Sequence, residues 1–235
     1  MFQAPAELYD AIYFSFKDYA AEAADVAARI RAAHPAARTV LDVACGTGEH
    51  ARLLAQSHGF AVDSLDLNAD FLRLARAKHP SGNFIVADMT DFDMGRRYDA
   101  VICLFSSIGY LKTLPRVQRA LACFRRHTAP GGVVIVEPWF PPGKLTPGHH
   151  STRTAETAGI RVDRVATTVL EDRLSRLRFD YTIRRGDTTE QLSELHELGL
   201  FTEAEMLQAF AAAGLAAQHE AASSGNRGMY LARVA

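Results

Sequence analysis

At 235 residues the chain is long enough for one domain, or for one domain with an insertion, and it can bury a substantial core. Its formal net charge of −1 and the lack of a basic cluster argue against nucleic acid as the main partner. The three cysteines have no C-x-x-C spacing, which argues against disulfides and zinc, and no apolar run reaches membrane-spanning length. Without a signal peptide, the expected location is the cytoplasm.

The first elements of the chain are an aromatic segment, residues 7–16, and an amphipathic helix. The helix is predicted over 18–31, with its first residue as the cap. The aromatic segment lies outside the predicted sheet. Its rings form either a hydrophobic flap over the core or a lid over a ligand, with the hydroxyls of Tyr9, Tyr13 and Tyr19 turned inward.

A glycine-rich turn follows the first β-branched run. Residues 39–43 predict a buried strand and residues 49–56 a helix, and Gly46 and Gly48 between them allow backbone to touch a ligand. Asp66 ends the second apolar run, about 20 residues past the first glycine, where a doubly wound sheet presents a carboxylate to ribose hydroxyls. The pattern predicts an adenosine site.

The composition of the turn separates two classes of adenosine ligand. A dinucleotide fingerprint, G-x-G-x-x-G, needs a third glycine where this chain has Ala51. Asp42 stands inside the turn, where its charge would repel a diphosphate but attract an ammonium group. These two features favour S-adenosylmethionine and argue against NAD and a dehydrogenase.

Beyond the turn, apolar runs alternate with helical patterns. Such alternation predicts parallel strands joined by right-handed crossovers, with ligands at the carboxyl ends of the strands. The predicted strands are 60–65, 83–86, 99–104 and 133–137, and the predicted helices are 68–78 and 114–126.

The alternation stops at Pro138. Four prolines between residues 138 and 147 prevent a regular element from continuing there. Alternating polar and apolar residues then predict a small antiparallel β insertion beside the main sheet, with strands at 160–170, 174–183 and 189–198.

The last part of the chain returns to the main sheet. A helix is predicted over 202–213 with a capping box of Thr202 and Glu205, followed by strands at 215–220 and 229–234. With these strands the main sheet has seven. The expected fold class is α/β: a doubly wound, mostly parallel seven-stranded sheet with a small antiparallel β insertion.

Four segments, in order along the chain, resemble the motifs of class I S-adenosylmethionine-dependent methyltransferases. Residues 42–48 resemble their first motif, Asp66 their ribose acid, residues 84–89 their adenine-edge segment, and residues 130–138 the loop and strand that close their core. The resemblance implies a Rossmann-like methyltransferase fold. The expected division is an N-terminal lid and helix, a cofactor-binding core, an insertion shaping the acceptor site, and a C-terminal helix with two strands, at 1–38, 39–138, 139–200 and 201–235.

The resemblance also implies S-adenosyl-L-methionine as the cofactor. The turn would cradle its methionine tail, the acid at the second strand end would bind its ribose, and the adenine-edge segment would bind its base. The residues expected to hold it are Tyr19, Asp42, Ala44, Gly46, Gly48, Asp66, Leu67, Asp88, Met89 and Leu104.

Nearly the whole chain further resembles the bacterial deoxyamino-sugar N-methyltransferases, which act on nucleotide-linked sugars. The likeness runs through residues 104–110, 136–140, 196–202 and 224–228. The chain departs from these enzymes at Tyr110, where they have histidine, and at Phe140, where they have a second tryptophan. Their acidic, histidine-rich insertion strand is reduced here to Glu194 and His196. The fold and cofactor therefore carry over better than the substrate.

The acceptor site is expected around the end of the fourth strand. The residues expected near the reacting groups are Tyr9, Tyr110, Glu137 and His196, and those expected to bind the acceptor are Tyr13, Ser106, Ser107, Trp139 and Arg227. Several of them have structural alternatives. The serines suit a turn, Glu137 could cap nearby backbone, His196 could be a satisfied strand histidine, and Arg227 could be a surface turn residue.

The leading hypothesis is an enzyme that transfers a methyl group to a small polar metabolite, with an amine nitrogen as acceptor, by in-line displacement. An amine needs only to be unprotonated, whereas a hydroxyl acceptor needs a base such as His196 or Glu137. O-methylation and a non-catalytic adenosine-binding module are the alternatives. No metal is expected, because His149 and His150 lack a third ligand. The expected partner is a small-molecule acceptor, without nucleic acid or membrane, and a homodimer is left open.

Overall fold

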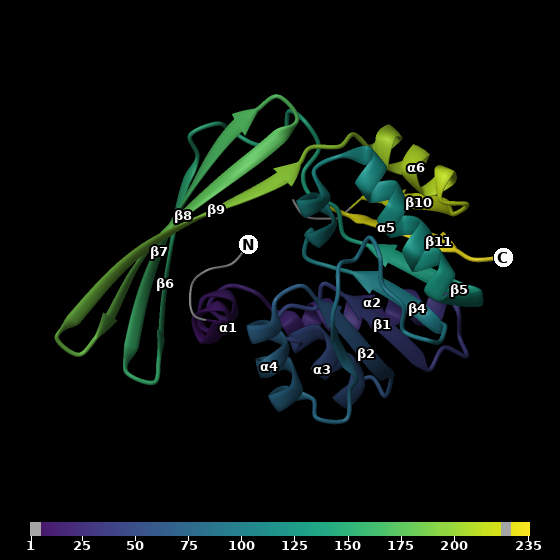
Figure 1. Cartoon of the computed structure of the whole chain (residues 1–235), viewed down its shortest axis with the longest axis horizontal. Coiled ribbons are helices and arrows are strands. Elements are labelled where there is room, and N and C mark those ends of the chain that lie inside the picture. The colour runs from purple at the N-terminus through teal and green to yellow at the C-terminus, as the bar shows by residue number, and fades with distance from the viewer. Residues whose placement is uncertain (1–5, 222–226) are drawn as a thin grey trace.

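The computed structural model describes residues 6–221 and 227–235, and a seven-stranded sheet forms its centre (Figure 1). The strands are β1 (Thr39–Val43), β2 (Ala61–Asp66), β3 (Phe84–Val86), β4 (Tyr98–Cys103), β5 (Thr128–Val136), β10 (Ala216–Glu220) and β11 (Met229–Arg233). Their order is β10-β11-β5-β4-β1-β2-β3, and every pairing is parallel except those of β11. This confirms the predicted fold class.

Side chains along the central strands alternate between two apolar cores, as a sheet covered on both faces requires. Val40 and Ile102 join one cluster with residues of α2 and α3, and Leu41 and Val101 join another with residues of α5 and α6. The helices of this unit are α2 (Tyr19–Ala33), α3 (Glu49–Gln56), α4 (Ala69–Lys78), α5 (Leu114–His127) and α6 (Glu203–Ala212).

Two predicted helix starts are confirmed by their caps. The Asp18 carboxylate accepts a hydrogen bond from the Ala21 N–H at 2.9 Å, before the first residue of α2. Thr202 and Glu205 form the reciprocal capping box at the start of α6. Within the described ranges, no helix combines the length and apolar character of a membrane span.

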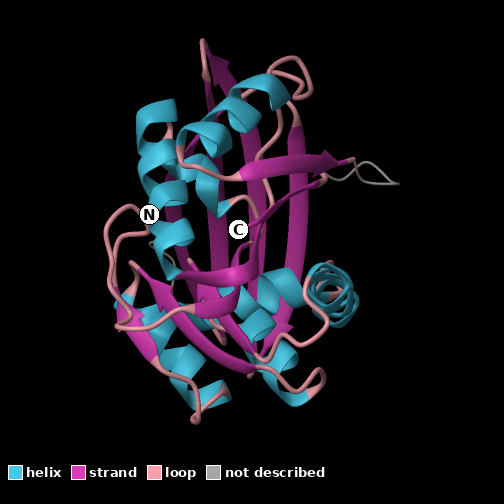
Figure 2. Ribbon diagram, turned by 90° about the vertical axis from the view of Figure 1, so that its right-hand side faces the viewer, coloured by secondary structure: helices cyan, strands magenta, loops and turns pink. Residues whose placement is uncertain are grey.

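A second, antiparallel sheet stands beside the core, and its long strands run upright behind it in Figure 2. Its strands, in order, are β6 (His150–Thr157), β7 (Ile160–Glu171), β8 (Leu174–Arg185) and β9 (Thr188–Gly199). The sequence predicted three of the four. β6 was missed because it is an edge strand in which Ala155 alone is buried, so it lacks the apolar alternation that marks the other three.

Helix α1 (Ala6–Phe14) bridges the two sheets, lying against β6 on one side and α4 on the other (Figure 1). Leu8 and Ile12 are buried in the apolar cluster of the four-stranded sheet. On the core side, Asp10 accepts hydrogen bonds from the Thr47 hydroxyl at 2.5 Å and from the Lys78 ammonium at 2.5 Å. The aromatic N-terminal segment is therefore a helix anchored to both halves of the molecule.

Candidate active site

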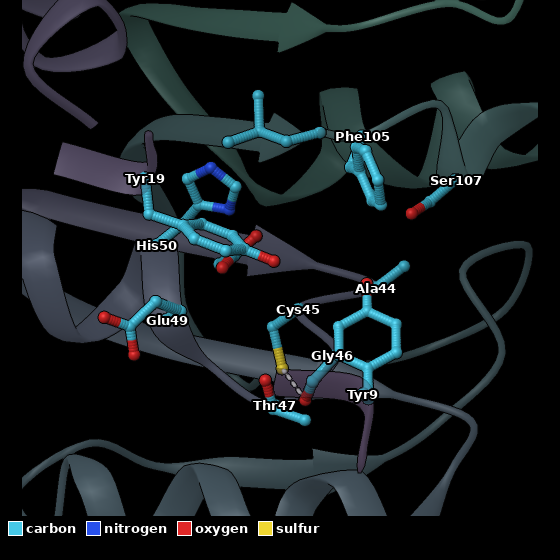
Figure 3. Close-up of a pocket in the computed structure, with 12 residues that line it drawn as sticks. Tyr9, Tyr19, Ala44, Cys45, Gly46, Thr47, Glu49, His50, Phe105 and Ser107 are labelled. Atoms are coloured by element: carbon cyan, nitrogen blue, oxygen red, sulfur yellow. Dashed lines mark hydrogen bonds between the residues drawn. The ribbon is translucent and has the colours of Figure 1, made fainter. Parts of the chain in front are cut away.

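A pocket lies where the carboxyl ends of β1 and β4 meet, and it holds about 400 Å³ including its open mouth (Figure 3). Its lining combines the glycine turn, the start of α3 and residues of α1 and α2. The lining residues are Tyr9, Tyr19, Asp42, Ala44, Cys45, Gly46, Thr47, Glu49, His50, Leu104, Phe105 and Ser107. The sequence interpretation had not singled out Cys45, Thr47, Glu49, His50 and Phe105. Four of these lie in or beside the glycine motif, which was the available signal.

The glycine turn is fastened by backbone hydrogen bonds. The Gly46 N–H donates to Asp66 Oδ2 at 2.9 Å, and the Cys45 N–H donates to the Leu65 carbonyl at 3.0 Å. Gly46 has a φ of +58°, and a Cβ there would find nothing nearer than the Tyr9 hydroxyl at 4.0 Å. The turn therefore leaves a bare backbone surface facing the pocket.

Gly48 has a different role from the one expected. It does not line the pocket, and a Cβ on it would stand 2.7 Å from the Cβ of Ala75 in α4. Its φ is +75°, in the region that favours glycine. Gly48 is therefore a packing position that lets α3 and α4 approach each other, and a contact from it to the cofactor stays a prediction.

Asp42 is the most unusual polar group of the pocket. It is 2% exposed, and its Oδ2 has no hydrogen-bond partner among the described residues. Burial, and then the nearby charge of Asp66, raise the pKa of Asp42 to about 8. A buried carboxyl oxygen without a partner is costly, and an ammonium group would satisfy it. The turn and this carboxyl together fit the amino-acid end of S-adenosylmethionine.

Aromatic residues from the N-terminal helices close one side of the pocket. Figure 3 shows Tyr9 beside Gly46 and Tyr19 beside His50, whose ring centroids are 5.0 Å apart. Burial raises the pKa of both tyrosines, so their hydroxyls stay neutral donors. His50 is held in turn by Glu22 at 2.9 Å. The lid that the sequence suggested remains our interpretation of this arrangement.

None of the four residues expected near the ribose and adenine is a lining residue of the pocket: Asp66 lies behind the turn, bonded to Gly46, and the other three follow β2 and β3. Leu67 follows β2 and is 49% exposed, and Met89 is buried beyond the end of β3. The Asp88 carboxylate accepts hydrogen bonds from the N–H and the hydroxyl of Thr90, both at 2.8 Å. All three lie beyond the strands next to Asp66, where the mouth of the pocket would receive a base.

The loop after β4 has a strained start. Phe105 and Ser106 have positive φ values of 52° and 62°, and a 3₁₀ helix, η1 (Ser107–Leu111), follows. The Phe105 N–H donates to Glu137 Oε2 at 2.7 Å. Ser106 is 1% exposed and donates to the Pro138 carbonyl at 2.7 Å. Ser106 therefore holds the loop in place, and Ser107 lines the pocket, while a substrate contact from either serine stays a prediction.

Glu137 and Arg227 form an ion pair. Arg227 Nη2 lies 2.5 Å from Glu137 Oε1, and its guanidinium lies 5.4 Å from the ring centres of both Trp139 and Phe140. Both carboxylate oxygens thus already accept hydrogen bonds, and the arginine charge is matched. This arrangement disfavours Glu137 as a free base and Arg227 as a free anchor for an anion. Residues 224–226 of the resembling segment lie outside the described residues.

The inner face of the four-stranded sheet carries a second polar group of residues. The Tyr110 hydroxyl of η1 lies 2.8 Å from His196 Nδ1, and His196 Nε2 lies 3.0 Å from Glu194 Oε1. The Tyr181 hydroxyl donates to the same carboxylate oxygen. Both His196 and Glu194 are buried, whereas Tyr110 is partly exposed. Tyr110 is not itself a lining residue of the pocket, but it raises the pKa of Tyr9, which is one.

Arg164 in β7 belongs to the same inner face, as its pairing with Tyr181 shows. It is 5% exposed, and its Nε and Nη1 have no hydrogen-bond partner among the described residues. Its guanidinium lies 4.5 Å from the ring centre of Phe179 and 5.2 Å from that of Tyr13. The sequence interpretation missed it, although a charged residue at an inward position of an alternating strand was the available signal.

Comparison with known proteins points to one group of enzymes. Residues 40–132 match a family described as "Methyltransferase domain". The chain is 42% identical over 229 residues to dTDP-3-amino-3,6-dideoxy-alpha-D-glucopyranose N,N-dimethyltransferase of Streptomyces fradiae, covering 96% of this chain and 89% of that one.

Two solved structures are similar over essentially the whole chain. Streptomyces venezuelae DesVI matches with a TM-score of 0.92 and 38% identity, covering 100% of both chains. An S-adenosylmethionine-bound amino pentose methyltransferase from Micromonospora echinaspora, involved in calicheamicin biosynthesis, matches with a TM-score of 0.86 and 34% identity. It covers 100% of this chain and 98% of its own.

Proposed function

The chain belongs to the S-adenosylmethionine-dependent deoxyamino-sugar N-methyltransferases, and on this basis we propose that it methylates the amine nitrogen of a nucleotide-linked deoxyamino sugar. The observation that carries the acceptor class is Arg164. Two N–H groups of this buried guanidinium lack a partner among the described residues, so it can receive an anion, and a diphosphate supplies one in a geometry that suits arginine. The name of the Streptomyces fradiae relative supports two successive methyl transfers.

The residues of the cofactor half of the site would bind and orient S-adenosylmethionine. S-adenosylmethionine supplies the activated methyl group when it is bound. The Asp42 carboxyl would hold its ammonium group and Asp66 its ribose hydroxyls, while the bare turn at Gly46 accepts its chain. Tyr9 and Tyr19 would exclude water from above, which strengthens every polar contact inside.

The acceptor half must place an amine lone pair in line with the methyl group, and positioning of this kind can supply roughly 7–11 kcal/mol. Tyr13, Ser107 and Tyr110 are placed to do this around the loop after β4. A hydroxyl acceptor would need an unengaged base at the pocket. Glu137, which is paired with Arg227, is not such a base, and the name of the Streptomyces fradiae relative, an N,N-dimethyltransferase, supports nitrogen as the acceptor.

The proposal is tested by incubating the purified chain with S-adenosylmethionine and dTDP-3-amino-3,6-dideoxyglucose, the sugar named for the Streptomyces fradiae relative. Mass spectrometry should show the gain of one and then two methyl groups. The 3-hydroxy counterpart should remain unchanged. Absence of any gain across a panel of nucleotide-linked amino sugars would contradict the proposed function.

Replacing Arg164 by methionine should raise the KM for the nucleotide-linked sugar by roughly ten- to hundredfold, the effect of losing a charged hydrogen bond, with a smaller change in kcat. Methionine keeps the apolar stem against Phe179, so folding should be unimpaired. The matched control is Arg161→Met in the same strand, whose exposed side chain lies on the opposite face of the sheet and which should leave KM unchanged. Steady-state kinetics decides, and equal KM values for the two variants would remove Arg164 from the acceptor site.

A further inference from the structure

A series of close polar contacts leads from Tyr110, in the loop after β4, into the four-stranded sheet. It runs from the Tyr110 hydroxyl to His196 Nδ1 at 2.8 Å, and from His196 Nε2 to Glu194 Oε1 at 3.0 Å. Tyr110 is 41% exposed, whereas the side chains behind it are buried. The series therefore has one end that a bound acceptor can reach and one end sealed inside the protein.

The direction of the hydrogen bonds follows from the buried end. Glu194 accepts a hydrogen bond from the Tyr181 hydroxyl, and His196 Nε2 lies 3.0 Å from the same carboxylate oxygen, so we assign the ring proton to Nε2, which faces Glu194. His196 Nδ1 is then an acceptor, and the Tyr110 hydroxyl donates to it. This leaves the lone pairs of the Tyr110 oxygen to accept a hydrogen bond from a substrate amine.

Tyr110 itself stays a neutral phenol. The residue as a whole is partly exposed, but burial of its hydroxyl end, and then the neighbouring Tyr13 and Glu194, raise the pKa of Tyr110. It can therefore accept a proton only while it passes its own to the next group. The titratable and charged groups that face it and its partners are Tyr9, Tyr13, Asp66, Arg164, Tyr181 and Glu194.

We propose that Tyr110 and His196 form a proton relay that removes a proton from the acceptor's ammonium group, with Glu194 as the positioning residue. This inference rests on the proposed function. The N–H bond of the ammonium breaks as its proton moves to the Tyr110 oxygen, and the nitrogen keeps the electron pair. The Tyr110 O–H bond breaks as that proton moves to His196 Nδ1. The resulting imidazolium is stabilised by the Glu194 carboxylate.

The relay explains how an amine that is protonated in solution can react at neutral pH. The imidazole of His196 lies behind the Tyr110 hydroxyl, so the tyrosine would connect it to a bound acceptor. The proton returns through Tyr110, the partly exposed end of the relay, and leaves to solvent when the products depart, which restores neutral His196 for the next transfer.

The first test is the pH dependence of kcat/KM with dTDP-3-amino-3,6-dideoxyglucose. In Tyr110→Phe and in His196→Gln, kcat/KM should fall roughly ten- to hundredfold at neutral pH. Above the pKa of the amine, it should recover toward the wild-type value. The kcat/KM of Glu194→Gln at neutral pH should lie between the values of these two variants and that of the wild type. Matched controls are Tyr98→Phe, which removes a hydroxyl donating to Asp63, and His34→Gln, beside Asp99. Both controls should keep the wild-type profile.

A loss of equal size at every pH would indicate a merely structural role and overturn the relay, while methylation by the wild type would leave the proposed function standing. A wild type that methylates no amino sugar would overturn both.

The second test needs no turnover. In nitrogen-15 spectra of histidine-labelled protein with S-adenosylhomocysteine, adding the amino sugar should convert His196 from neutral imidazole to imidazolium. The signal is assigned by its loss in His196→Gln. The 3-hydroxy sugar should cause no conversion, and neither should the amino sugar in Tyr110→Phe. A neutral His196 in the wild-type complex with the amino sugar would overturn the relay.

Discussion

Replacing Asp42 by asparagine is expected to weaken S-adenosylmethionine binding by roughly ten- to hundredfold, the usual effect of losing a charge-assisted hydrogen bond. Asparagine keeps the size and one carbonyl oxygen, so the pocket should keep its shape. Isothermal calorimetry of the wild type and the variant measures the difference. Equal affinities would show that the ammonium group of the cofactor binds elsewhere.

The same substitution should change how stability depends on pH. The pKa of Asp42 is raised to about 8 in the folded chain, from an ordinary value of 3.8. The folded chain thus holds a proton that the unfolded chain has lost, so stability falls as pH rises from about 4 to about 8 and is level above. Asp42→Asn should remove this contribution, which is on the order of a few kcal/mol. Denaturant unfolding of the cofactor-free protein across that range measures it.

Cofactor binding should reverse this protonation. An ammonium group favours the ionised carboxylate, so near neutral pH the wild type should release a proton from Asp42 on binding the cofactor. Asp42→Asn should release none from this position. Calorimetry in two buffers of different ionisation enthalpy separates the cases, and unchanged proton release in the variant would contradict the role of Asp42.

Gly48→Ala is expected to destabilise the fold by roughly 2–5 kcal/mol. The new Cβ would stand 2.7 Å from the Cβ of Ala75 and 3.1 Å from its Cα, and the φ of +75° disfavours any side chain. α3 would have to move away from α4. Chemical denaturation with calorimetric melting measures the loss.

Gly46→Ala is the matched control, because it shares the turn and the positive φ without the clash. Its Cβ would meet only the Tyr9 hydroxyl at 4.0 Å, so backbone strain of about 1–2 kcal/mol is the expected cost. Its main effect should be on cofactor affinity, since Gly46 lines the pocket and Gly48 does not. Equal losses of stability in the two variants would show that packing against Ala75 is unimportant.

Local sequence patterns predicted most of the fold. Alternation of apolar runs and helical periods located the seven strands of the main sheet, and caps such as Asp18 and Thr202 marked helix starts. β6 was not predicted because this edge strand buries only one side chain, so its sequence shows no alternation of apolar and polar residues. Ser107–Leu111 was read as a loop, and its 3₁₀ turn is too short for a helical pattern to show.

The two halves of the site differed in what sequence could reveal. The cofactor half is built largely from one contiguous stretch, residues 42–50, so its chemistry is visible in a single motif. The acceptor half depends on contacts between distant residues. The Glu137–Arg227 pair spans 90 positions, and the Tyr110–His196 hydrogen bond spans 86. Nothing in the local sequence shows that two charges neutralise each other or that a histidine lies behind a tyrosine.

The double anchorage of α1 has a consequence for the order of events. Leu8 and Ile12 tie the helix to one sheet, and Asp10 ties it to Thr47 and Lys78 beside the other. A movement of α1 that opened the cofactor side of the site would therefore also disturb the acceptor side, and the reverse. The two affinities become thermodynamically linked, and reciprocity makes each ligand change the other's affinity by the same factor. Through α1, the binding or release of either ligand would therefore change the affinity for the other.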